Sequence, residues 1–188
     1  PTTTPVPPTT TPVPPTATPA PATATPVPAT ATPAPATATP APSSAAIIYG
    51  DSLAAGWANW SWDTTTNFSY TKRYRTGRAS LAVTYTAPWA GLYLHRDAAL
   101  PTAGYSKLSL WVYGGTSGGQ PIKLSTRDGT GKASPEVKLP APRAGRWTLV
   151  EVRLSQLGSP ANIAELFFQE AGGAARPIFF IDELRLVP

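Results

Sequence analysis

Aromatic and hydrogen-bonding side chains recur at every second position in several short stretches of this sequence. In 89–96 the alternate positions carry Trp89, Tyr93 and the only histidine, His95. Flat aromatic rings can stack on the apolar faces of pyranose rings, and imidazole, amide and charged groups can hydrogen-bond the sugar hydroxyls. The residue types in this pattern therefore suit a surface that binds sugar.

The same alternation sorts three further stretches, 106–114, 121–128 and 163–170, into two faces. In each stretch one set of alternate positions is mainly apolar, for example Leu108 and Leu110, and we assign this set to the core. If all four stretches belong to one sheet, its outer face carries Trp89, Tyr93, His95, Trp111, Tyr113, Lys123, Arg127 and Gln169. Exposed rings in such number predict a binding face. The alternative is that a loop or the N-terminal strand covers this face and turns it into a second small core.

Three tryptophans fall within six residues in 56–63. We assign Trp57 to the core. Trp60 and Trp62 share a parity and either fill the open end of the fold or form a wall of the ligand site, so both join the candidate binding residues. Trp147 follows a turn and begins an alternating apolar stretch, which favours core packing.

The elements that must position these residues are short strands. Period-two stretches separated by Pro, Gly and Asp clusters occur at 47–51, 66–74, 79–86, 89–96, 106–114, 121–128, 135–140, 146–154, 163–170 and 177–187. No window of ten or more residues shows an apolar period of 3.6, and the best helical candidate is a single turn at 154–158. The sequence predicts an all-β domain, a two-sheet antiparallel jelly-roll sandwich.

Residues 1–43 are a Pro/Thr/Ala-rich segment that repeats every seven residues from Thr4 and holds fifteen of the 24 prolines. Proline fixes φ and excludes helix, so we expect a disordered, extended linker. Residues 44–188 carry all the charged side chains and form the folded domain. Such spacers are typical of proteins outside cells. Because the chain opens on Pro1 without a signal peptide, we interpret it as the C-terminal piece of a longer exported protein with an upstream, covalently linked catalytic domain.

Composition also argues against several function classes. The net charge is +5, but the basic residues are scattered, and their one cluster, Lys72, Arg73, Arg75 and Arg78, is explained as a solvated loop. We therefore expect no nucleic-acid partner. We also expect no membrane association and a monomer. The sequence has no cysteine and shows no Ser-His-Asp arrangement, phosphate-binding glycine loop or His/Cys metal cluster.

Four features together resemble a known family. These are Asp51 after the first strand, SKLSLWVYGG at 106–115, RWTLVEVRLSQL at 146–157 and the closing IFFIDELRLV at 178–187. The frame is similar to the β-sandwich, galactose-binding-like carbohydrate-binding modules of secreted glycoside hydrolases. The resemblance covers essentially all of 45–188.

The resemblance implies a structural calcium ion. Such modules typically carry an Ile-Asp-Asp-Ile type sequence in the last strand, and here 181–184 reads Ile-Asp-Glu-Leu. In many of them the aspartate of that strand joins an acidic residue near the domain start, which maps onto Asp182 and Asp51. Calcium prefers six to eight oxygen ligands, so two carboxylates and backbone carbonyls would suit it. The alternative is that Asp182 caps a turn or pairs with Arg185.

Three functions compete. The leading hypothesis is a non-catalytic module that holds an upstream enzyme on a polysaccharide, a β-glucan such as cellulose or a hemicellulose. The second is a jelly-roll polysaccharide lyase, in which Tyr93 and His95 transfer protons and Lys123 or Arg127 neutralises a uronate. A glycosidase is disfavoured because it needs two carboxylates, and we find none on the expected face. The third is a protein-interaction module of a cell-surface protein.

Overall fold

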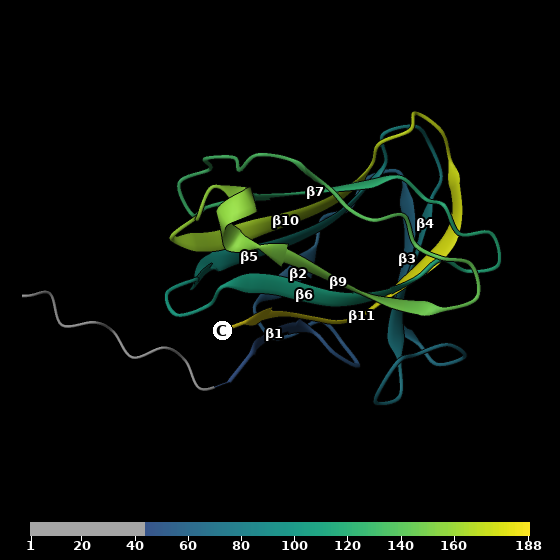
Figure 1. Ribbon diagram of the computed structural model, residues 1–188, viewed down its shortest axis with the longest axis horizontal. Coiled ribbons are helices and arrows are strands. Elements are labelled where there is room, and N and C mark those ends of the chain that lie inside the picture. Colours follow the sequence, from purple (N-terminus) through teal and green to yellow (C-terminus); the bar gives the residue numbers. More distant parts are fainter. Residues whose placement is uncertain (1–43) are drawn as a thin grey trace, which may run out of the picture. The chain divides into compact units, whose positions relative to one another are not determined.

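The computed structural model describes residues 44–188 (Figure 1). The predicted linker, 1–43, lies outside the described residues. The strands are β1 (Ala46–Tyr49), β2 (Trp57–Asn59), β3 (Thr64–Tyr70), β4 (Ser80–Tyr85), β5 (Gly91–Pro101), β6 (Lys107–Tyr113), β7 (Ile122–Arg127), β8 (Val137–Lys138), β9 (Trp147–Arg153), β10 (Asn162–Glu170) and β11 (Arg176–Val187). A 3-10 turn, η1 (Leu154–Leu157), occupies the predicted single helical turn. Within the described range no helix has the length and apolarity needed to cross a bilayer.

The strands form two antiparallel sheets. Sheet A has the order β3-β4-β11-β6-β9, with β1 also pairing with β11, and sheet B has the order β2-β5-β10-β7-β8. In Figure 1, β5, β10 and β7 run side by side in one layer, and β6, β9 and β11 run in the other. The predicted two-sheet antiparallel sandwich is confirmed. Each of the ten expected strands is present, some with shifted ends.

The core lies between the sheets and is filled by the aliphatic parity of each strand. Leu108 and Leu110 of β6 are fully buried, as are Leu92 and Leu94 of β5. Burying one such side chain stabilises the fold by roughly 1.5–3 kcal/mol. The Tyr85 hydroxyl enters the same core and donates to the Phe168 carbonyl oxygen over 2.7 Å, which satisfies its polar group.

The tryptophan-rich segment contributes a strand, β2, that the sequence did not predict. Trp57 pairs with Arg96 of β5 and is 7% exposed, so its assignment to the core is confirmed. The segment continues along β5 after β2 ends, because the Trp60 amide donates to the Tyr93 carbonyl oxygen and Trp62 forms a bridge with Gly91. The edge of sheet B is therefore lined by a tryptophan-bearing chain.

The prediction that four strands share one sheet is wrong for β6. That strand pairs with β11 and β9 in sheet A, whereas β5, β7 and β10 belong to sheet B. Trp111 and Tyr113 therefore lie on the opposite outer face from Trp89 and His95. Alternation identifies the side chains that point away from the core, but a sandwich has two outer faces and alternation does not distinguish them.

Candidate functional site

The outer face of sheet B is built from three rows of side chains that run across its central strands. The pairing of β10 with β5 and with β7 fixes these rows. They contain Gly91, Gln169 and Lys123 in the first row, Tyr93, Phe167 and Ser125 in the second, and His95, Glu165 and Arg127 in the third. The sheet thus brings together five of the predicted residues, with Trp60, Trp62 and Trp89 beside them.

Glycine at position 91 makes room for the Trp62 ring. A Cβ added to Gly91 would collide with that ring, so the indole lies directly on the sheet. From there it contacts Phe167 at a centroid distance of 6.3 Å, and Phe167 in turn stacks on Tyr93 at 4.4 Å. An aromatic floor therefore crosses the middle of the face.

Trp60 extends this floor toward the third row. Its indole stacks on the His95 imidazole with centroids 3.7 Å apart and planes within 9°. The Tyr93 ring meets it edge-on at 5.7 Å. Even so, Trp60 is 53% exposed, so the outer face of the indole is open to a ligand.

Trp89 lies in the turn that precedes β5. Its backbone has a positive φ of 62°, which is unusual for a residue with a side chain. Three groups hold it there: Trp62 Nε1 and Gln169 Nε2 donate to the Trp89 carbonyl oxygen over 3.0 and 2.9 Å, and Glu170 accepts from its amide. The side chain is 54% exposed.

Glu170 organises the loop beside Trp89. This fully buried carboxylate accepts backbone N–H groups from Gly172, Gly173 and Ala174 and the Nε of Arg176. Burial alone would raise the pKa of Glu170, but the Arg176 guanidinium and the backbone N–H groups together hold it below its ordinary value. The ionised carboxylate therefore fixes the position of the exposed tryptophan.

Two basic side chains on the sheet B face, Lys123 and Arg127, have acidic neighbours. Lys123 Nζ lies 2.7 Å from Glu136 Oε1, and Arg127 Nη1 lies 3.6 Å from Glu165 Oε2. His95 lies between Asp97, at 2.9 Å, and Glu165, at 3.8 Å. Lys138 of β8, directly opposite Lys123, has no carboxylate within 4.0 Å among the described residues, so the face keeps an excess of basic charge.

Glu165 and Phe167 are two site residues that the sequence prediction did not include. Both have the outward parity of 163–170, the same parity that selected Gln169, so the signal was present. The expectation that this face has no carboxylate is wrong, because Glu165 sits in its third row. Glu136 is a second carboxylate at this face, and both lie beside cations, Glu165 next to Arg127 and Glu136 next to Lys123.

A hollow of about 310 Å³ lies over the second and third rows. Its lining includes Trp62, Phe167, Arg127, Glu136 and Gln169. Pockets for small ligands typically begin near 300 Å³ and combine apolar walls with a few polar groups. This hollow has both properties, with aromatic rings on its floor and amide, guanidinium and carboxylate groups around them.

The phenol of Tyr93 is poorly suited to proton abstraction. Burial and the neighbouring Glu165 carboxylate raise its pKa to about 12. A general base works best when its pKa lies near the working pH, so Tyr93 stays protonated and acts as a hydrogen-bond donor at neutral pH. The face can therefore stack and hydrogen-bond a ligand more readily than transform it.

The outer face of sheet A, where Trp111 and Tyr113 lie, is covered by the loop at 71–79. Arg75 Cζ lies 4.5 Å from the Trp111 ring centroid, and Arg73 Cζ lies 4.6 Å from that of Tyr113. These guanidinium groups occupy the aromatic faces that a sugar would need. The basic loop is exposed to solvent as expected, and two of its arginines also pack on aromatic rings.

Several outward aromatic residues of sheet A form a second small core. Tyr113 is 8% and Phe180 5% exposed, and Tyr70 and Trp147 pack against them. Trp147 is thus only partly buried and lies outside the main core to which the sequence assigned it. The covered face that the sequence analysis offered as an alternative is present, but on sheet A.

The two carboxylates expected to bind calcium instead anchor the same loop. Asp51 Oδ1 accepts the amides of Arg78 and Ala79, at 2.5 and 3.0 Å. Asp182 accepts three backbone amides, and its neighbour Glu183 pairs with Arg185. Calcium needs oxygen ligands, whereas N–H donors surround these carboxylates, so the described residues do not fit the expected site. No cluster of three or more acidic or histidine side chains suited to a metal occurs in 44–188.

Comparison with known proteins gives matches in structure only. No family model matches the sequence, and no curated protein matches it either. The fold is that of carbohydrate-binding modules. The family 30 module of the cellulosomal cellulase Cel9D-Cel44B from Clostridium thermocellum aligns with a TM-score of 0.57 and 13% identity, over 76% of this chain and 96% of that one.

Two further solved structures with this fold contain bound sugars. The family 11 module from Clostridium thermocellum, in complex with a β-1,3-1,4-mixed-linked tetrasaccharide, has a TM-score of 0.56 and 14% identity over 76% of this chain and 95% of that chain. The CBM22-1-GH10 modules of xylanase 10B from the same organism, complexed with xylohexaose, have a TM-score of 0.50 and 17% identity over 70% of this chain and 26% of that chain. The β-sandwich predicted from the resemblance is confirmed.

Proposed function

We propose that residues 44–188 form a non-catalytic carbohydrate-binding module whose ligand lies on the outer face of sheet B. The observation that carries this proposal is the aromatic floor, which runs from Trp62 through Phe167 and Tyr93 to Trp60 beside a hollow with polar walls. Exposed rings at this density support stacking on pyranose rings. A hollow with hydrogen-bonding groups suits a sugar chain better than the flat, apolar surface typical of a protein interface.

The ligand is a neutral polysaccharide, a β-glucan such as cellulose or a hemicellulose. Lys123 and Arg127, the two cations beside the aromatic rings, each have a carboxylate next to them, which disfavours binding of a uronate there. The sugar complexes of the structural neighbours, a mixed-linked glucan tetrasaccharide and xylohexaose, support the same class of ligand.

The module has a targeting role in this proposal. The Pro/Thr-rich repeat of 1–43 joins it to a further domain of an exported protein, and the module keeps that domain on its substrate. The raised pKa of Tyr93 supports a role without catalysis.

Calorimetric titration with mixed-linked glucan oligosaccharides and xylohexaose, together with pull-down on insoluble cellulose, tests the proposal. We expect Trp60→Ala to weaken binding about 30-fold, because it removes an exposed ring of the size that dominates interface energies. Trp111→Ala is the matched control, since it removes the same side chain from the covered face.

If the parent binds none of these glycans, the proposal fails. It also fails if Trp111→Ala weakens binding as much as Trp60→Ala while both variants keep the parent's circular dichroism spectrum.

A further inference from the structure

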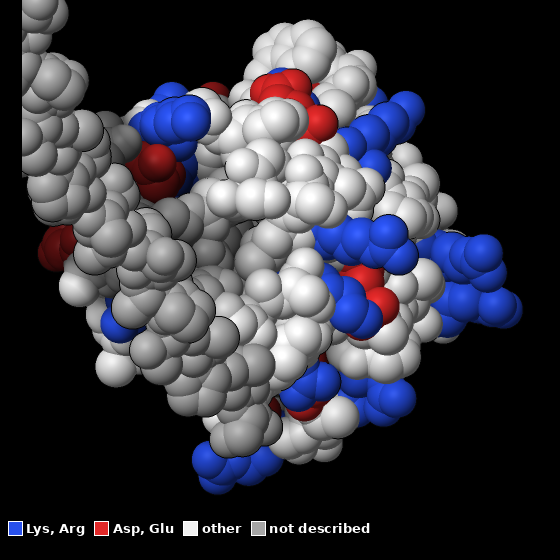
Figure 2. Space-filling model, turned by 60° about the vertical axis from the view of Figure 1, so that its left-hand side comes forward, with Lys and Arg blue, Asp and Glu red and all other residues white. Residues whose placement is uncertain are grey.

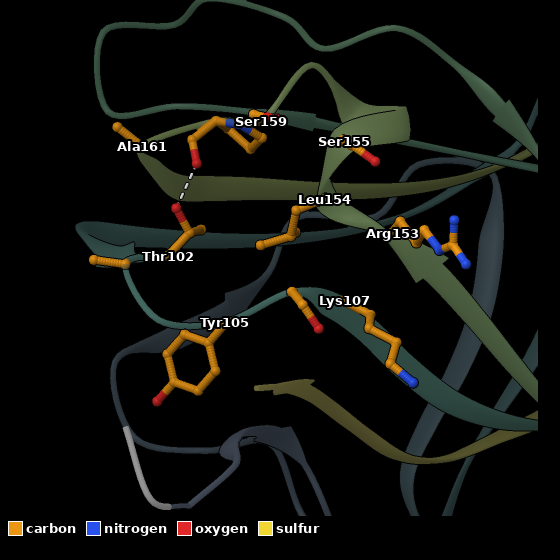
Figure 3. Close-up of a pocket in the computed structure, with 11 residues that line it drawn as sticks. Thr102, Tyr105, Lys107, Arg153, Leu154, Ser155, Ser159 and Ala161 are labelled. Carbon is orange, nitrogen blue, oxygen red and sulfur yellow. Dashed lines mark hydrogen bonds between the residues drawn. The ribbon is translucent and has the colours of Figure 1, made fainter. Parts of the chain in front are cut away.

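A second, larger hollow lies at one end of the sandwich, away from the sheet B face. Its volume is about 590 Å³, and none of its lining residues lines the hollow over Phe167. Figure 3 shows that three segments surround it: the connection from β5 to β6, the end of β9 with η1, and the loop that leads into β10. The Thr102 hydroxyl donates to the Pro160 carbonyl oxygen and links two of these segments.

The lining has the mixed character of a sugar site. Tyr105, Leu154 and Pro160 provide apolar surface, and the hydroxyls come from serine and threonine side chains. The volume lies within the range of roughly 300–1,000 Å³ that is typical of small-ligand sites. A pyranose ring has both apolar faces and hydroxyls, so it matches this combination.

Two cations mark the rim of the hollow. Lys107 of β6 and Arg153 of β9 pair directly across sheet A, and Figure 3 shows both side chains extending to the same side. Like charges placed opposite each other destabilise a sheet. Glu151 Oε1 lies 2.9 Å from Lys107 Nζ and offsets its charge, whereas Arg153 has no carboxylate within 4.0 Å in the described part of the chain. In Figure 2, which turns this side of the molecule forward, basic surface exceeds acidic surface.

We propose that this hollow binds a pyranose that carries a carboxylate, that is, a uronate unit of an acidic polysaccharide. The sugar ring lies against Tyr105, and its carboxylate lies between Lys107 and Arg153. The planar guanidinium of Arg153 can form two parallel hydrogen bonds to a carboxylate. This site goes beyond the neutral ligand of the sheet B face and uses different residues.

The contrast with the sheet B face is one of charge. There Arg127 has Glu165 beside it, so an incoming carboxylate meets a paired cation. At the end of the sandwich it meets the Arg153 guanidinium, which has no carboxylate within 4.0 Å among the described residues, and the Lys107 ammonium group, which lies beside Glu151. Charge complementarity therefore favours an acidic sugar in this hollow, whereas Arg127 beside the aromatic rings of the sheet B face is already paired.

The test is titration of the full chain with oligogalacturonate and, as a matched ligand, its methyl-esterified form, which has the same rings without the charge. We expect Arg153→Gln to weaken oligogalacturonate binding at least about tenfold, as expected for the loss of a charge-assisted hydrogen bond. Lys72→Gln, which removes the same charge from the 71–79 loop, leaves affinity unchanged. Ala103→Trp fills the hollow without changing charge and also abolishes binding.

Equal affinity for the esterified ligand would overturn the proposal, as would an equal loss in Lys72→Gln. Competition by inorganic sulfate as effective as that by galacturonate would show a general anion site and would also overturn it. Trp60→Ala, measured with a neutral glucan in parallel, separates this site from the sheet B face. Loss of glucan binding with unchanged oligogalacturonate binding supports two independent sites.

Discussion

The outer faces of the two sheets carry similar aromatic side chains but differ in what lies over them. On sheet A the guanidinium groups of Arg73 and Arg75 cover Tyr113 and Trp111. On sheet B the indoles of Trp60 and Trp89 are each more than half exposed. The difference lies in one loop, 71–79, which folds onto its sheet, whereas the face of sheet B has no such cover among the described residues.

Each face depends on a buried carboxylate that organises a loop. Asp182 on sheet A accepts the amides of Arg75 and Thr76 and so keeps the covering loop in place. Glu170 on sheet B accepts amides of the 172–174 loop and of Trp89, and so keeps a tryptophan exposed. Similar chemistry therefore closes one aromatic face and displays the other.

Truncating one phenylalanine on each face tests the difference between the two faces and has the largest expected effect. Phe180→Ala removes the centre of the covered cluster, and we expect the free energy of unfolding to fall by about 3–5 kcal/mol with little change in glycan affinity. Phe167→Ala removes a ring that Trp62 and Tyr93 contact, and we expect the larger loss in affinity there. Urea denaturation and calorimetric titration of both variants make the measurement.

A fall in affinity for Phe180→Ala, measured where the variant is still folded, would contradict the assignment of the faces. Phe168→Ala serves as the reference for stability, because Phe168 lies in the main core and is fully buried.

The next largest expected effect is that of substituting Glu170, the buried carboxylate of sheet B. We expect Glu170→Gln to lower the free energy of unfolding by about 2 kcal/mol, because the amide cannot replace an ionised acceptor of Arg176 and several N–H groups. The folded-state pKa lies below its ordinary value of 4.5, so this stabilisation is present above that pH and is lost as the pH falls through the folded pKa. The variant's acid denaturation curve should therefore be flatter than the parent's below about pH 4.5.

Glycan binding tests the second half of this prediction. Since Glu170 fixes the backbone of Trp89, Glu170→Gln should also weaken affinity by a few-fold at neutral pH. Asp97→Asn, which changes an exposed carboxylate near His95, is the control for stability. If the parent and Glu170→Gln have the same acid denaturation curve, the ionised form of Glu170 does not stabilise the fold.

Much of the fold could be predicted from alternation. The aliphatic parity placed Leu108, Leu92 and Phe168 in the core, where all three are fully buried. This works because the two-residue period of a strand is a local property. Sheet order is not local: β6 follows β5 along the chain but pairs with β9 and β11, so the sequence placed Trp111 on the wrong face.

Alternation could predict the site residues that lie within strands, because it gives the direction of each side chain. It could not predict the residues whose position depends on a loop. The sequence did not decide whether Trp60 and Trp62 belong to the core or to a wall of the ligand site. Only the pairing of their segment with β5 places them on the face. The cover over Trp111 depends on Asp182, which is more than 100 positions from the loop amides that it accepts. Such long-range hydrogen bonds leave no periodic trace in a sequence.

The carboxylate of sheet A should have a smaller effect than that of sheet B. Burial raises the pKa of Asp182 even though three backbone amides oppose this, so its ionised form is less favoured than that of Glu170. We expect Asp182→Asn to lower the free energy of unfolding by about 1 kcal/mol and to increase the solvent exposure of Trp111 in the folded state. Because the pKa of Asp182 is higher in the folded state than in the unfolded chain, the parent gains stability as the pH falls through the raised pKa, and the gap between parent and variant should widen there.

Acrylamide quenching of tryptophan fluorescence reports the opening of the loop. Asp63→Asn, a carboxylate outside both anchors, is the control. Unchanged quenching in Asp182→Asn would mean that the guanidinium groups hold the loop without help from the carboxylate.

The smallest expected effect concerns calcium. The resemblance implies an ion between Asp51 and Asp182, but both carboxylates already accept backbone amides of the covering loop, and Arg78 lies 4.0 Å from Asp51. Binding of calcium would require these amides to turn away, which removes the anchor of the loop. We therefore expect less than about 1 °C change in Tm between millimolar calcium and a chelator. A clear rise in Tm with calcium that is lost in Asp182→Asn would show that an ion, and not the amides, closes the face of sheet A.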